Sequence, residues 1–138
     1  MMLNFNNCKK TKFFDKNFFL YMEEIDFCIR LKKLGKKIFI LNYTIANHLG
    51  GQSHNPTYNF EMELQRNWHY MWSLFYFNKK HYGILFAIKK TIKKLLSSFF
   101  KTIIYFVLRN HNKYLTYKSR FAGLLYAYLN KKSNYKIF

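Results

Sequence analysis

The sequence predicts an α-rich α+β fold, in which several helices accompany one short strand. Apolar residues recur at helical spacing after Glu23 and again over most of the chain after Glu61, whereas Lys37–Leu41 (KIFIL) is a short apolar run typical of a buried strand. Aromatic residues make up 22% of the 138 residues, which is too many for an intrinsically disordered chain. A chain of this length is expected to form one modest domain.

The N-terminal part predicts one helix, one strand and a loop. Acidic side chains in the first turn place the start of a helix at Glu23, and Gly35 is expected to end it. The strand Lys37–Leu41 follows, and then a polar loop over Asn42–Pro56 that contains His48.

The C-terminal part predicts further helices. One is expected over Glu61–Lys80, and a second over Ile84–Leu108, where lysines and serines occupy one side of the helical wheel and apolar residues the opposite side. A polar break is expected over Arg109–Lys118, followed by a short helix over Phe121–Leu129. Residues 1–56 are therefore predicted to form one part and residues 57–138 a basic, amphipathic, helical extension.

The formal net charge of +18 predicts an anionic partner, either a lipid surface or a nucleic acid, although the many Lys, Asn, Ile, Phe and Tyr residues are also typical of AT-rich coding. Few arginines, no helix-turn-helix and no RNP-like pattern argue against nucleic acid. The basic amphipathic stretch favours an anionic membrane surface, although the same pattern also describes a surface helix that covers a core.

The two cysteines and the N-terminus bear on location. Cys8 and Cys28 have neither metal-ligand nor CxxC spacing, which is typical of a reduced protein. The first residues do not follow the pattern of a signal peptide, and no apolar run reaches the roughly 18 residues of a spanning helix. We expect a cytoplasmic protein that is peripheral at the inner face of the cell membrane.

The six acidic residues are unevenly distributed, since three of them fall within Glu23–Asp26. One interpretation is structural: carboxylates stabilise the N-terminal end of a helix, and Asp26 can pair with Arg30 four residues later. The other interpretation is that one carboxylate is a general base that takes a proton from an acceptor hydroxyl.

A longer pattern around these acids carries a family resemblance. Residues 14–31, FDKNFFLYMEEIDFCIRL, are followed by Gly35 and by HLGGQS at residues 48–53. This order resembles the pattern FDExFFxYxED-x-DLCxR…G…HxGGxS of family 2 glycosyltransferases, most closely their rhamnosyltransferase-like branch. The resemblance covers residues 1 to about 55, and RNWHYMWSLFYFNKKHYG at residues 66–83 matches more loosely.

The resemblance implies roles for four residues. Glu24 would be the general base, in a position where many members carry Asp. Glu23 would line the site, and Asp26 would organise the acidic helix together with Arg30. His48 would contribute to a Mg²⁺ or Mn²⁺ site at the donor diphosphate.

The implied reaction is inverting transfer of a sugar from a nucleotide-sugar to a hydroxyl of a glycan or lipid-linked acceptor, in cell-surface polysaccharide or glycolipid synthesis. The implied fold is the C-terminal fragment of a GT-A, Rossmann-like domain. No Asp-x-Asp metal motif occurs in the sequence, so we expect the donor to be bound by a separate N-terminal half and the chain alone to be incomplete. The alternatives are an inactive remnant, a partner subunit, or a basic module that binds nucleic acid or membrane.

Overall fold

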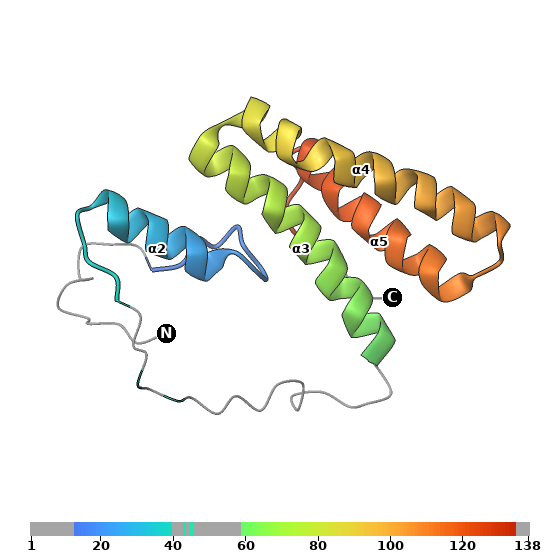
Figure 1. The fold of residues 1–138 in the computed structure, drawn as a ribbon, viewed down its shortest axis with the longest axis horizontal. Helices are drawn as coiled ribbons and strands as arrows, with labels where there is room; N and C mark the ends of the chain where they lie inside the picture. Colours follow the sequence, from blue (N-terminus) through green and yellow to red (C-terminus); the bar gives the residue numbers. More distant parts are fainter. Residues whose placement is uncertain (1–12, 40–42, 44, 46–58, 135–138) are drawn as a thin grey trace.

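The computed structural model describes residues 13–39, 43, 45 and 59–134, and the regular structure of these residues is helical. The helices are α2 (Glu23–Lys33), α3 (Asn59–Tyr82), α4 (Ile84–Val107) and α5 (His111–Tyr128). Figure 1 shows α3, α4 and α5 packed together, each reversing the direction of the helix before it, while α2 lies beside α3. The fold is therefore a three-helix bundle with a fourth helix attached to its side.

The predicted α+β fold is wrong, because the described residues contain helices and no strand. Within the predicted strand Lys37–Leu41, the first three residues are irregular, and Ile38 and Phe39 are 49% and 75% exposed; the last two residues lie outside the described part of the chain. A strand needs a neighbour to satisfy its backbone N–H and C=O groups, and a lone apolar run provides none. The described residues are thus all-α and not part of a Rossmann-like sheet.

Glycine ends α2 as the sequence predicts. Gly35 has a φ of 70°, in the left-handed region that favours glycine, directly after the last residues of the helix. Its backbone N–H donates to the carbonyl of Lys32, and the N–H of Lys36 donates to the carbonyl of Leu31, each over 3.0 Å. This pair of hydrogen bonds is a Schellman motif, and it satisfies carbonyl groups that the end of the helix would otherwise leave without donors.

The predicted polar break over Arg109–Lys118 is wrong, since most of this segment belongs to α5. The Asn110 side chain caps the helix by accepting a hydrogen bond from the backbone N–H of Lys113 at 3.2 Å. The ring of Tyr117 stacks on Tyr105 of α4 with centroids 5.4 Å apart. The polar side chains in this segment therefore line the exposed side of a helix whose other side contacts α4.

The core of the bundle is aromatic and lies mainly on α3. Aromatic residues on one helix can either pack in a core or form a surface that stacks on sugar rings. Four of those on α3 are buried, namely Trp68, Trp72, Phe75 and Phe77, and Tyr76 is partly buried, whereas Tyr70 and Tyr82 are exposed. The buried residues that form the core cluster are Trp68, Met71, Trp72, Phe75, Ala87, Leu124 and Ala127. Packing of the bundle therefore accounts for most of the aromatic stripe.

The exposed surface of α4 is basic. All five lysines of this helix are exposed: Lys89, Lys90, Lys93, Lys94 and Lys101. Among the residues that the structure describes, no helix combines enough length and apolarity to cross a bilayer.

Close packing of α3 against α5 depends on Gly123. A Cβ atom at this position would overlap the carbonyl oxygen of Trp68 and lie 3.0 Å from its carbonyl carbon. The overlapped atoms belong to the α3 backbone, so they cannot move aside without shifting the helix. Because Gly123 has no side chain, the backbones of α3 and α5 can approach each other closely at this position.

Replacing Gly123 with Ala is expected to lower the free energy of unfolding by about 1 to 3 kcal/mol, because the added methyl group separates the two helices. Helix propensity alone predicts the opposite sign, since Ala stabilises a helix interior by about 1 kcal/mol relative to Gly. Urea denaturation followed by circular dichroism measures the change, with the exposed Lys118→Ala on the same helix as a control that should stay within about 0.5 kcal/mol. A more stable Gly123→Ala protein would contradict the observed packing.

Candidate functional site

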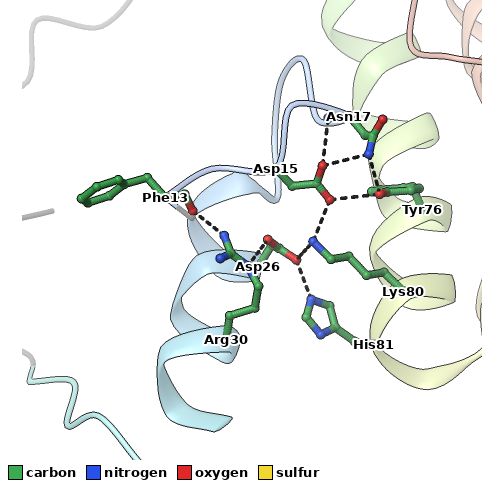
Figure 2. A network of polar contacts seen from close by, with 8 residues as sticks. All are labelled: Phe13, Asp15, Asn17, Asp26, Arg30, Tyr76, Lys80 and His81. Carbon is green, nitrogen blue, oxygen red and sulfur yellow. Dashed lines mark hydrogen bonds and ion pairs between the residues drawn. The ribbon is translucent and has the colours of Figure 1, made fainter. Parts of the chain in front are cut away.

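A network of charged side chains joins α2 to the end of α3 (Figure 2). Asp26 is fully buried at its centre. Its Oδ2 accepts a hydrogen bond from Arg30 Nε at 2.9 Å, and its Oδ1 lies 2.6 Å from Lys80 Nζ and 2.8 Å from His81 Nε2. Because a carboxylate can only accept, His81 Nε2 carries the proton in this contact.

Asp15 forms the second half of the network. Its Oδ2 accepts hydrogen bonds from Lys80 Nζ at 2.7 Å and from the Tyr76 hydroxyl at 3.0 Å. Its Oδ1 accepts from the backbone N–H of Asn17 at 3.0 Å, which folds the chain into an Asx turn. Arg30 also donates to the backbone carbonyl of Phe13. Lys80 therefore bridges two carboxylates, and the segment before α2 is attached both to α2 and to α3.

The electrostatics of the network favour the charged forms of Asp15, Asp26 and Lys80. Burial alone would raise the pKa of Asp15, but hydrogen bonds from Lys80 and from the Asn17 backbone outweigh burial and hold the pKa at about 2. Burial acts in the same direction on Asp26, and hydrogen bonds from Lys80 and Arg30 outweigh it, so the Asp26 pKa lies below its ordinary value. Burial would lower the pKa of Lys80, but hydrogen bonds to the two carboxylates raise it overall.

The chain enters α2 through a strained turn. Tyr21 and Met22 have φ values of 68° and 69°, a region that costs an L-residue on the order of 1 kcal/mol or more. Contacts with α3 hold this geometry: Ser73 Oγ donates to the carbonyl of Leu20 at 2.8 Å, and the Tyr21 ring meets Tyr70 edge-on with centroids 5.7 Å apart. The bundle thus fixes the position and direction of the first turn of α2.

The structure separates the three acids of α2 by exposure. Glu24 is exposed, Glu23 is partly buried, and Asp26 is enclosed by the network. The Glu23 Oε2 atom is buried and accepts no hydrogen bond from the described part of the chain. Asp26 and Arg30 form the ion pair that their spacing predicts. Asp26 is therefore a residue that positions the helix, and it is not exposed to solvent.

The predicted metal ligand His48 lies outside the described residues. Within the described ranges, no three His, Cys, Asp or Glu side chains lie close enough together to hold a metal ion. The carboxylates of Asp15 and Asp26 instead bind the cationic side chains of α3 and Arg30.

A hollow of about 720 Å³ opens beside the network. Its lining combines aromatic, basic and acidic side chains: Phe13, Phe14, Asp15, Lys16, Arg30 and Lys80. Neither Glu23 nor Glu24 is among the described residues that line it.

Sequence reasoning missed the residues of α3 that complete the network, namely Tyr76, Lys80 and His81. Two signals pointed to them. A buried carboxylate such as Asp26 needs cationic partners, and Arg30 alone can satisfy only part of it. The second signal is the loose resemblance over residues 66–83, which contains all three of these side chains.

The depressed pKa of Asp15 predicts how stability depends on pH. A carboxylate with a lowered folded-state pKa stabilises the fold above its ordinary pKa of 3.8, and this contribution is lost as the pH falls through about 2. The difference in unfolding free energy between the native chain and Asp15→Asn should therefore shrink between roughly pH 5 and pH 2. Urea titrations across this range measure it, and Glu63→Gln, which changes an exposed acid, is the control. A difference that stays constant over the range would show that Asp15 is not held in its charged form.

Comparison with protein-family models, with curated proteins and with solved structures finds no match to this chain.

Proposed function

We propose that the chain supplies the proton-accepting side of a glycosyltransferase similar to family 2, with Glu24 as the general base. The observation that carries the proposal is the opposite placement of Glu24 and Asp26. Residues two apart on a helix point to nearly opposite sides, and Asp26 is locked inward by Arg30 and Lys80. Glu24 is therefore directed to solvent, where an acceptor can reach it.

The proposed reaction is a single displacement. The acceptor hydroxyl attacks the anomeric carbon of the donor sugar as the bond from that carbon to the diphosphate oxygen breaks. Glu24 takes the hydroxyl proton, and the diphosphate leaves with the electron pair of the broken bond. Glu23, by the same resemblance, would line the acceptor site.

The donor is proposed to bind elsewhere. The sequence contains no Asp-x-Asp motif, and in the proposal a separate N-terminal half binds the nucleotide-sugar. The proposal also includes a divalent cation at the donor diphosphate, with His48 as one of its ligands. This cation would stabilise the leaving group. The acceptor class is a glycan or lipid-linked glycan, and the proposed location is the inner face of the cell membrane.

A partner subunit without catalysis is the second candidate, and the network itself favours it. The contacts of Asp26 with Arg30, Lys80 and His81 explain its position without any catalytic role. The acids in the first turn of α2 also stabilise the helix through its dipole. In this reading the acidic cluster only fixes α2 on the bundle. The two candidates differ in what they require of Glu24, since only catalysis needs its carboxylate.

A transfer assay with Glu24→Gln separates these candidates. The chain is joined to a donor-binding half that carries Asp-x-Asp, and sugar transfer is measured from a panel of nucleoside diphosphate sugars with Mn²⁺. Glu24→Gln should lower the rate about a hundredfold or more, because Gln cannot take the proton. Glu63→Gln makes the same chemical change at an exposed acid of α3 and should leave the rate unaffected.

Transfer that survives Glu24→Gln would show that another group is the base. If the joined native protein transfers no sugar at all, the partner-subunit candidate is favoured.

A further inference from the structure

The most deeply buried residues of α4 have small side chains. Ala87, Thr91 and Ser98 are the buried residues of this helix, and they lie on one side of it. Thr91 Oγ1 donates to the carbonyl of Ala87 at 2.7 Å and lies 3.0 Å from the hydroxyl of Tyr128 on α5. Ile88 and Leu95, which are partly buried, pack against the core beside these small residues.

Other large apolar side chains of α4 point away from the core. Leu85, Phe100 and Val107 are 80%, 58% and 72% exposed. Together with two further exposed residues they follow one side of the helix at helical spacing: Leu85, Leu96, Phe100, Ile103 and Val107. We refer to these five residues as the apolar stripe. The bundle does not cover this stripe, so α4 is not simply a surface helix with its apolar side turned to its own core.

The charges around the stripe are all positive. All five lysines of α4 are exposed: Lys89 lies on the same side as the stripe, Lys93 lies at its edge, and Lys90, Lys94 and Lys101 lie between the stripe and the buried side of the helix. The sequence contains no Asp or Glu after Glu63, so neither α4 nor α5 carries a negative side chain. A partner of this surface must therefore present negative charge next to an apolar phase.

We infer that α4 lies along the surface of an anionic lipid bilayer, with the apolar stripe at the boundary of the acyl chains and the lysines at the headgroup phosphates. A helix with one apolar side and a lysine-rich side binds bilayers in this manner. The long lysine side chains can reach the phosphates while their methylene groups stay beside the apolar stripe. This inference holds whether or not the chain takes part in sugar transfer.

The chemistry of the surface favours a bilayer over two other partners. A second copy of the chain would bring one row of lysines toward an identical row, and no acid on α4 or α5 could pair with it. A nucleic acid would neutralise the lysines but would leave the apolar stripe in contact with water. An anionic bilayer satisfies both the charge and the apolar side chains.

Vesicle flotation tests the inference with the full chain. Vesicles contain phosphatidylcholine alone or phosphatidylcholine with about one-third phosphatidylglycerol. Binding to the anionic vesicles should be at least about tenfold tighter, because each lysine near the surface contributes electrostatic attraction. Equal binding to both compositions would overturn the inference.

Two matched triple variants locate the charge effect. They remove the same charge at different places: Lys90→Gln, Lys94→Gln and Lys101→Gln on α4, and Lys32→Gln, Lys33→Gln and Lys36→Gln at the end of α2. The α4 variant should bind anionic vesicles on the order of tenfold or more weakly than the native chain, whereas the α2 variant should keep most of its binding. Equal losses in both would mean that net charge alone drives binding, and the inference would fail.

A second matched pair tests the apolar stripe. Phe100→Ser with Ile103→Ser removes exposed apolar side chains from α4, and Ile25→Ser with Leu34→Ser removes them from α2. Only the α4 pair should weaken vesicle binding, and circular dichroism should show all variants equally helical. Unchanged vesicle binding by the α4 pair would overturn the inference. The inference would also be overturned if the native chain formed an oligomer without lipid and the α4 pair dissociated it. That result would identify a second copy of the chain as the partner.

Discussion

Lys80 Nζ lies 2.7 Å from Asp15 and 2.6 Å from Asp26, and this single ammonium group connects the acidic helix to the bundle. Asp26 is fully buried, so its charge is tolerated only because cations from both helices surround it. Asp15 extends the same connection to the turn before α2. The orientation of α2, and with it the exposure of Glu24, depends on this interaction.

The bundle provides a rigid base for that connection. Tyr76 and Lys80 lie on the same helix as the buried Trp72 and Phe75, so the groups that hold Asp15 are positioned by the aromatic core. On the far side of the core, α4 packs through small residues together with Ile88 and Leu95, and its apolar stripe and lysines face outward. The same bundle therefore presents two different surfaces: an acidic first turn on α2, and a basic, apolar surface on α4.

Local patterns in the sequence predicted the helices well where they carried their own start and stop signals. Gly35 ends α2 and Gly83 separates α3 from α4, and both have positive φ, a conformation that glycine adopts at less cost than other residues. The predicted strand at Lys37–Leu41 failed because strand formation depends on a partner elsewhere in the chain, which an apolar run cannot reveal. The polar break predicted over Arg109–Lys118 was wrong because most of this segment belongs to α5, where its polar residues line the exposed side of the helix.

The candidate site was predictable only in part for the same reason. The pairing of Asp26 with Arg30 follows from their spacing on one helix, whereas the contacts with Lys80 and His81 join residues more than fifty positions apart. The role proposed for Glu24 came from a resemblance. Its exposure came from the geometry, since only the structure shows which side of α2 is turned inward.

Hydrogen exchange of the α2 amides in a double-mutant cycle of Asp26→Asn and Lys80→Met measures the central interaction directly. The two changes should each accelerate exchange in α2, and their effects should be non-additive by about 1 to 2 kcal/mol because the residues share one contact. The amides in the middle of α4 and α5 should exchange as in the native chain. Additive effects, or α2 amides that exchange at the native rate in both single variants, would contradict the view that Lys80 and Asp26 hold α2 on the bundle.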